Sequence, residues 1–152
     1  MTMDAEIYSA VLHRVAQGDH GWGGPYDFAA LYVLDHAVPS VEHPDTDLQL
    51  PAAGRLFDKA LQSALRSSCA DLPPLTFVQS FQGVCDTQRR GTIQIRDRGG
   101  FIALGPITSD TDQATVGAMF YAGHRWARWL RYHLQREDST WRVVRCEVLA
   151  VS

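Results

Sequence analysis

Two stretches of the chain place apolar residues at helical spacing. The first contains Ile7, Tyr8, Val11, Leu12 and Val15. Asp4 precedes it in an N-cap position and Gly18 follows it where a closing glycine is expected, so the pattern predicts a helix over residues 5–17. The second stretch predicts a helix that ends near Ser67, and its apolar residues are Leu56, Phe57, Ala60, Leu61, Ala64 and Leu65.

Much of the remaining chain has the composition of strands. Residues 28–38 are rich in aromatic and β-branched side chains and stop at Pro39, which predicts a buried strand, with a helical start as the alternative. Later strand-like segments cover residues 75–81, 92–96, 101–107, 114–122, 126–136 and 141–151. Short turns between the last three predict an antiparallel meander. The expected fold is therefore α+β: a bent antiparallel sheet with a C-terminal meander, packed on two or three helices in a cone-like shape.

Alternation along the last three strands assigns their faces. The predicted core sets are Val116, Ala118 and Phe120, then Leu130, Tyr132 and Leu134, and finally Val144, Cys146, Val148 and Ala150. Gly117, inside a strand, predicts a bend or bulge. The opposite face has the aromatic and arginine content of contact surfaces. We expect a homodimer through this face, or a segment of the same chain that covers it; the interface residues would be Met119, Trp129, Arg131 and His133.

Composition indicates a globular protein. The chain has 152 residues, 45% of them hydrophobic and 20% charged, which predicts a single domain over residues 1–152. No segment approaches the roughly 20 apolar residues of a membrane span. The acidic start lacks the features of a secretory signal, so we expect a cytoplasmic protein without membrane contact. Three cysteines without a Cys-x-x-Cys pair predict reduced thiols, and Cys146 is the best candidate for a buried one.

Charge is unevenly spread along the chain. The net charge is −3, yet residues 1–76 hold 10 acidic and 4 basic side chains, while residues 77–152 hold 7 acidic and 10 basic ones. The acidic half is therefore able to attract the basic half by their opposite charges. Nucleic acid is not an expected partner, because the whole chain is acidic and its arginines are dispersed.

The run from Tyr132 to Val144, with the acidic turn Glu137-Asp138 before Trp141-Arg-Val-Val, is similar to the closing hairpin of the nuclear-transport-factor-2-like (SnoaL-like) superfamily. That resemblance implies a cone-shaped domain with a pocket, which different members use for isomerisation, dehydration, cyclisation, ligand carriage or protein binding. Fold analogy does not select among these functions. The N-terminal run from Ile7-Tyr8 through Asp19-His20 to Tyr32-Val33, with the terminal Val151-Ser152, also resembles a family of uncharacterised bacterial proteins.

The loop between the first helix and the early strand is the leading candidate site. Residues 18–26 contain four glycines and a proline. We expect His20 to act as a proton donor, because a helix C-terminus and a neighbouring carboxylate raise the affinity of an imidazole for a proton. Asp19 would orient the ring of His20. The expected substrate-binding residues are Trp22, Tyr26, Tyr32 and Tyr121. The alternative is a structural loop in which His20 caps the helix.

Other polar clusters give weaker evidence for a functional site. Asp35-His36 is a second acid–imidazole pair, but adjacent strand residues point to opposite faces. Tyr121, His124 and Arg125 surround a turn between two strands, where polar residues are the ordinary expectation. The chain has no His-x-His, His-x-x-x-His or Cys-x-x-Cys spacing and no nucleotide-binding motif, so we expect neither a metal nor a cofactor.

Two classes of function fit these residues. The first is a cofactor-independent acid–base enzyme of the isomerase, cyclase or dehydratase (lyase) type, which binds an apolar or aromatic small molecule. The second is a non-catalytic protein-binding module that uses the sheet face with Trp129 and Arg131 or the acidic loop at residues 39–53. The sequence alone leaves open whether the chain is an enzyme.

Overall fold

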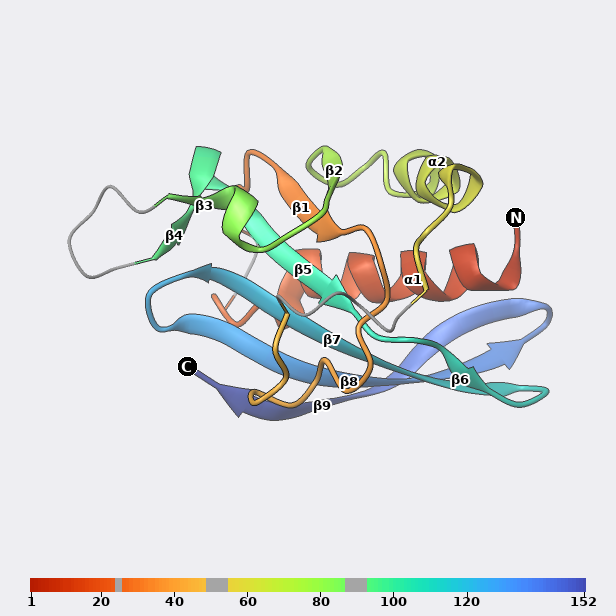
Figure 1. Cartoon of the computed structure of the whole chain (residues 1–152). Coiled ribbons are helices and arrows are strands. Elements are labelled where there is room, and N and C mark those ends of the chain that lie inside the picture. Colours follow the sequence, from red (N-terminus) through yellow and green to blue (C-terminus); the bar gives the residue numbers. More distant parts are fainter. Residues whose placement is uncertain (24–25, 49–54, 87–92) are drawn as a thin grey trace.

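The computed structural model describes residues 1–23, 26–48, 55–86 and 93–152. They form a mixed α+β fold of two α-helices and a large, curved, mostly antiparallel sheet (Figure 1). The helices are α1 (Met3–Arg14) and α2 (Lys59–Ser68). The strands are β1 (Leu31–Leu34), β2 (Leu75–Val78), β3 (Cys85–Asp86), β4 (Gln94–Ile95), β5 (Gly100–Leu104), β6 (Thr108–Ser109), β7 (Gln113–Gly123), β8 (Trp126–Glu137) and β9 (Thr140–Val151).

Both predicted helices form, with different starting points. Thr2, not Asp4, caps α1: the Thr2 hydroxyl accepts a hydrogen bond from the Ala5 amide at 3.2 Å. A π-helical turn, η1 (Val15–Asp19), continues α1. Helix α2 starts after its N-cap Asp58, so the apolar residues just before it belong to the preceding segment.

The large sheet has the strand order β2-β1-β5-β7-β8-β9, and β6 pairs with β7. Strand β1 runs parallel to both of its neighbours, and the other pairs are antiparallel, which confirms the meander β7-β8-β9. The early strand is wrong in length, since β1 covers only Leu31–Leu34. Past Leu34 the chain leaves the sheet, and His36 pairs instead with Leu56 before α2.

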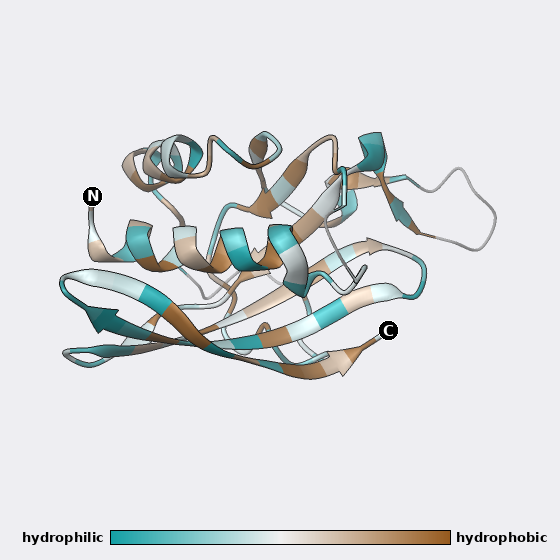
Figure 2. Ribbon diagram, turned by 180° about the vertical axis from the view of Figure 1, so that it is seen from behind, coloured by the Kyte–Doolittle hydropathy of each residue, from teal (hydrophilic) through white to brown (hydrophobic). Residues whose placement is uncertain are grey.

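Helix α1 lies across one face of the sheet, against β9 and beside α2 (Figure 2). The core sets predicted for β7 and β8 are confirmed, because all six side chains are buried there. The set predicted for β9 is wrong in part: Val144 is 55% exposed and Val148 is 47% exposed, whereas Trp141 is buried. Val144 falls at one of two register shifts between β8 and β9, where the alternation of faces is interrupted. Val148 stays on the core face opposite Leu130 but lies on the edge strand, where no further strand covers it.

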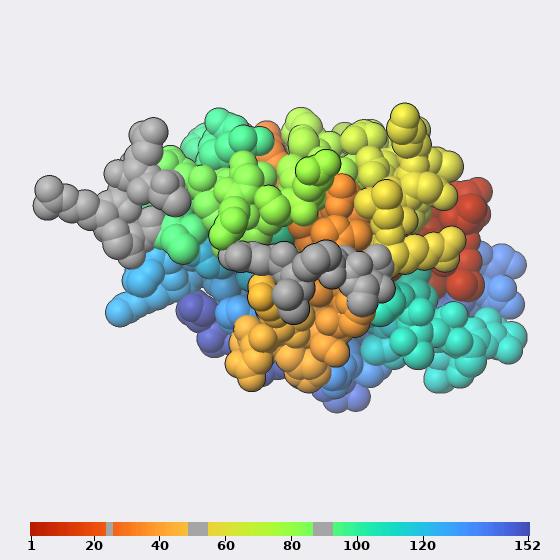
Figure 3. All heavy atoms as spheres, in the orientation of Figure 1, coloured from red at the N-terminus to blue at the C-terminus, as the bar shows by residue number. Residues whose placement is uncertain are grey.

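The opposite face of the sheet is covered by residues 35–48 of the same chain, which cross in front of the meander (Figures 1 and 3). Val38 and Val41 pack there with Met119, which is only 6% exposed. Gly117 lies directly below this segment: a Cβ at Gly117 would overlap the Glu42 carboxylate. No bulge is found at Gly117, since the register shift of β7 against β8 falls between Tyr121 and Gly123.

Within the described residues, no helix is long and apolar enough to cross a membrane. The three cysteines are free thiols. Cys69, not Cys146, is the most deeply buried of them, because it packs between the two helices while Cys146 sits on the edge strand.

Candidate functional site

A pocket of about 550 Å³ lies where the loop after η1 meets the turn between β7 and β8. We call it the aromatic pocket. One wall consists of aromatic rings, and the other carries polar and charged side chains. The aromatic wall is formed by Trp22, Tyr26, Phe28 and Trp126. The polar wall includes Asp86, Gln94, Asp97, Arg98 and His124.

The rings of the aromatic wall are in contact with one another. The centroid of Trp126 lies 4.9 Å from that of Trp22 and 4.8 Å from that of Tyr26, and the Trp22 and Tyr26 centroids are 5.0 Å apart. These distances leave no gap for a molecule between the rings. The rings therefore form a platform, and Trp22 is 59% exposed on it.

Two glycines in the loop shape this platform. Gly21 and Gly23 have φ values of +92° and +90°, which residues other than glycine rarely adopt. A Cβ at Gly21 would also collide with the guanidinium of Arg128. The glycine-rich composition of the loop therefore has a conformational cause at these two positions. Residues 24 and 25 lie outside the described residues.

The polar wall is held by the turn between β4 and β5. Asp97 and Arg98 have φ values of +58° and +50°. Such left-handed conformations are costly for these residues and concentrate at functional sites. The hydroxyl of Tyr32 donates a hydrogen bond to the Asp97 carboxylate at 2.8 Å, and the guanidinium of Arg96 stacks over the Tyr32 ring at 5.1 Å. Tyr32 thus supports the pocket from behind and does not line it.

His20 lies behind the aromatic wall and is fully buried. Its ring packs against Phe28, Phe120 and Trp126 at centroid distances of 5.5, 6.0 and 6.0 Å. The amide of Trp22 donates to its Nδ1 at 3.1 Å, so the neutral ring carries its proton on Nε2. Nε2 is buried and has no hydrogen-bond partner among the described residues.

The environment of His20 favours the neutral imidazole. Burial is the main cause that lowers the pKa of His20, the charge of Arg128 lowers it further, and the charge of Asp19 opposes both. This direction is opposite to the one expected from the helix C-terminus and the neighbouring carboxylate. The sequence predicted a His20 ring beside a substrate cavity, whereas the ring follows η1 and is fully buried in the core.

Asp19 is engaged elsewhere. Its carboxylate accepts a hydrogen bond from the Tyr132 hydroxyl at 3.0 Å and forms an ion pair with Arg14 at 3.2 Å. Among the described contacts, no hydrogen bond joins Asp19 to His20. The same carboxylate acts on Cys146, where burial first and the charge of Asp19 second raise the pKa of the thiol to about 11. Asp19 fastens the end of α1 to β8.

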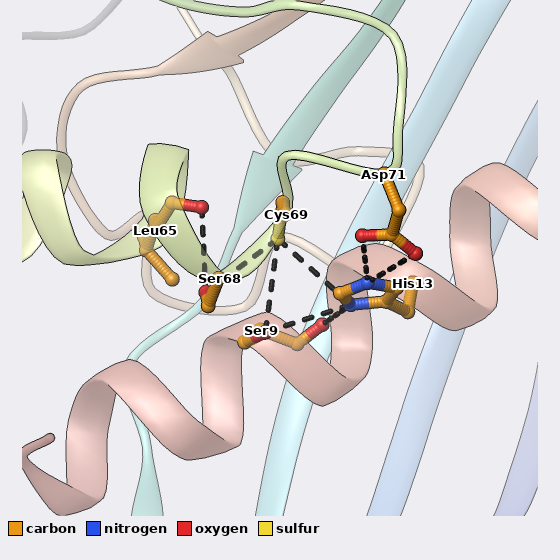
Figure 4. A network of polar contacts seen from close by, with 6 residues as sticks. All are labelled: Ser9, His13, Leu65, Ser68, Cys69 and Asp71. Atoms are coloured by element: carbon orange, nitrogen blue, oxygen red, sulfur yellow. Dashed lines mark hydrogen bonds and ion pairs between the residues drawn. The ribbon is translucent and has the colours of Figure 1, made fainter.

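A cluster that the sequence did not reveal joins α1 to the end of α2 (Figure 4). The Nε2 atom of His13 lies 2.9 Å from the Asp71 carboxylate, and the thiol of Cys69 lies 3.8 Å from Nδ1 of the same ring. The arrangement of Cys69, His13 and Asp71 resembles a catalytic triad of nucleophile, base and acid. No spacing in the sequence links positions 13, 69 and 71.

The hydrogen bonds of this cluster contradict a nucleophilic role. Nδ1 of His13 lies 2.8 Å from the Ser9 carbonyl oxygen, which accepts only, so Nδ1 carries a proton and does not take one from the thiol. Cys69 is 2% exposed, and burial raises the pKa of its thiol. The cluster therefore has a structural role: its hydrogen bonds hold α1 against the end of α2.

The remaining predicted residues lie away from the aromatic pocket. Tyr121 packs on Phe81 at 5.1 Å and its hydroxyl donates to the Ile93 carbonyl oxygen at 2.8 Å. Arg131 lies 3.7 Å from Glu42, and His133 lies 2.5 Å from Glu147. Trp129 packs against the buried residues around Met119, which include Val38 and Val41.

The acid–imidazole pair Asp35-His36 lies past the end of β1, where the two side chains bond each other at 2.8 Å instead of pointing to opposite faces. Among the described residues, no group of three or more His, Cys, Asp or Glu side chains is arranged so that it could hold a metal ion. Comparison of the chain with family models, with curated proteins and with solved structures gives no match.

Proposed function

We propose that this domain binds a small molecule with a flat ring at the aromatic pocket and does not convert it chemically. The observation that carries the proposal is the platform of Trp22, Tyr26 and Trp126, which faces a charged wall across a pocket of about 550 Å³. Flat rings stack on exposed aromatic side chains with a favourable contribution of about 1–3 kcal/mol. Asp97 offers acceptors and Arg98 offers donors for polar groups at the edge of such a ring.

The position of the expected acid–base pair supports binding without catalysis. A general acid or base must come within hydrogen-bond reach of the reacting atom. His20 is separated from the pocket by Phe28 and Trp126, and Asp19 is occupied by Tyr132 and Arg14. Neither residue lines the pocket, so a ligand on the platform stays out of their reach.

The acid–base enzyme of the isomerase, cyclase or lyase type is the second candidate. The buried Nε2 of His20 without a partner favours it, because a ligand that displaced the covering rings would find a free donor there. The protein-binding alternative has less support. Residues 39–48 of the acidic loop lie on the sheet, where Glu42 faces Arg131, and residues 49–53 are outside the described chain.

Benzamide and cyclohexanecarboxamide are the probes that test the proposal. Both carry the same amide, but only benzamide has a flat aromatic ring. We expect benzamide to bind with a Kd of about 1 mM, which is a usual affinity for a molecule of its size. Cyclohexanecarboxamide should bind at least several times more weakly. Saturation-transfer NMR titrations measure both affinities.

Replacement of the exposed ring supplies the matched control. Trp22→Ala should weaken benzamide binding roughly 10-fold. Trp129→Ala, which removes a tryptophan on the opposite face of the sheet, should leave it unchanged. Equal binding of the two amides, or equal effects of the two substitutions, would contradict the proposal.

A further inference from the structure

Strand β9 forms a free edge of the large sheet. Among the described strands it pairs with β8 alone, over 12 residues, and it is the last strand in the sheet order. A long edge strand presents unpaired backbone donors and acceptors and is a template for another strand. Native proteins usually protect such an edge with charge or cover.

Several side chains of β9 are apolar and exposed. Val144, Val148 and Val151 are 55%, 47% and 63% exposed, and Leu149 is 37% exposed. Apolar residues recur along the strand that leads to the C terminus (Figure 2). Val148 stands opposite the fully buried Leu130, so it projects from the same face as the core but has no neighbour beyond the edge.

The charges of β9 are arranged to match a second β9 strand. Arg145 and Glu147 flank Cys146, and the Arg145 guanidinium lies 3.7 Å from the Glu147 carboxylate. If two copies pair antiparallel about a two-fold axis at Cys146, Arg145 stands opposite the partner's Glu147 and Glu147 opposite the partner's Arg145. In the same register Val144 stands opposite the partner's Val148. Opposite charges and apolar pairs directly across two strands stabilise their pairing.

The two bulges of β9 do not interrupt this register at its centre. They fall at Val144 and at Leu149, so the stretch from Arg145 to Val148 stays regular against β8. The face of the sheet offers less surface to a partner. Met119 is already covered by residues 35–48, and Arg131 already faces Glu42.

We propose that a second copy of this chain pairs with it antiparallel through β9, with the two-fold axis at Cys146, so that the two sheets become one. Such an interface is isologous: each chain contributes the same residues, and each contact occurs twice. The proposal is independent of the aromatic pocket.

Charge reversal on β9 tests both the interface and its register. We expect the parent chain to sediment as a dimer at tens of micromolar. Arg145→Glu places two carboxylates opposite each other at two symmetric points of the interface, and Glu147→Arg places two guanidinium groups together there. Each variant alone should therefore dimerise at least 10-fold more weakly, since like charges directly across two strands repel. An equimolar mixture of the two variants should form a heterodimer, because every acidic position then meets a basic one.

Arg142→Glu is the matched control, since Arg142 lies on the same strand, has an exposed side chain and stands opposite no charged residue in this register. It should dimerise like the parent. Circular dichroism checks that all variants are folded. A monomeric parent at these concentrations, single variants that dimerise as well as the parent, or a mixture that stays monomeric would each overturn the proposal.

Discussion

The side chain of His20 sets the chemistry that the aromatic pocket can support. The ring is fully buried behind Phe28 and Trp126, and it accepts from the Trp22 amide. Burial and Arg128 both lower its pKa. A neutral imidazole in this place packs as an aromatic ring against Phe28, Phe120 and Trp126.

The lowered pKa of His20 makes stability depend on pH. The unfolded chain takes up a proton at His20 below pH of about 6.5, whereas the folded chain takes it up only at a lower pH. The free energy of unfolding should therefore fall as the pH drops from 7.5 to 5.5, by up to about 1.4 kcal/mol per pH unit for this one group. His20→Gln removes the titrating group, so its stability should fall less over the same range.

Urea unfolding of the parent and of His20→Gln at both pH values measures this difference. The comparison uses only the change in the free energy of unfolding between the two pH values. A buried glutamine also lowers stability, but by the same amount at both pH values. An identical pH dependence in parent and variant would show that the pKa of His20 is the same in the folded and unfolded chains.

The sequence pointed to two of the four aromatic residues of the pocket, Trp22 and Tyr26, but it missed Phe28 and Trp126 and placed Tyr32 and Tyr121 there wrongly. Trp22 and Tyr26 stand in a glycine-rich loop between two elements, and that pattern alone marks them as lining a cavity. The burial of His20 depends on the π-helical turn η1, which rotates the ring toward β7 and β8. A π turn of this kind has no apolar periodicity that would predict it.

At the scale of elements, the segment at residues 35–48 does most to change the surface of the sheet. It buries Met119 and brings Glu42 to Arg131. Its close approach requires Gly117, whose hydrogen leaves room for the Glu42 carboxylate. A strand interior with glycine is otherwise unfavourable, so this contact is the physical reason for the residue.

Gly117→Ala should destabilise the fold by about 1 kcal/mol, because Glu42 must move and its contact with Arg131 is lost. Such a change lowers the Tm by about 2–4 °C in a chain of this size. Thermal unfolding measures the shift. Gly18→Ala is the control: no atom lies within 4 Å of a Cβ at Gly18, so its Tm should stay the same or rise slightly. Equal Tm values for the two variants would show that residues 35–48 are not closely packed against β7 at Gly117.

The strands of the meander show how far alternation predicts burial. It is correct for β7 and β8, which have neighbours on both sides. It fails for β9, where two bulges and a free edge leave Val144 and Val148 in solvent and bury Trp141 instead. Bulges depend on the pairing of two strands, and neither strand carries a local signal for them.

At the scale of the whole molecule, the arrangement of the sheet is the least predictable feature. Strand β1 lies parallel to both β2 and β5, although long stretches of chain separate these strands. Parallel pairing needs a crossover, and nothing in a short apolar run indicates which partner it finds. The contact of Glu42 with Arg131 is one ion pair between the acidic half and the basic half of the chain. The cone-like shape and the resemblance to the nuclear-transport-factor-2-like superfamily stay predictions.

The central claim is that a flat ring binds on the aromatic platform and does not reach His20. The chain has four tryptophans, and each gives one indole N–H resonance in a ¹⁵N correlation spectrum. Trp22 and Trp126 belong to the platform, while Trp129 lies on the other face of the sheet and Trp141 is buried in the core. On titration with benzamide we predict that the first two resonances shift and that those of Trp129, Trp141 and the His20 ring do not. Shifts at Trp129 or Trp141 without shifts at Trp22 would contradict the platform, and a shift of the His20 ring nitrogens would contradict the non-catalytic account.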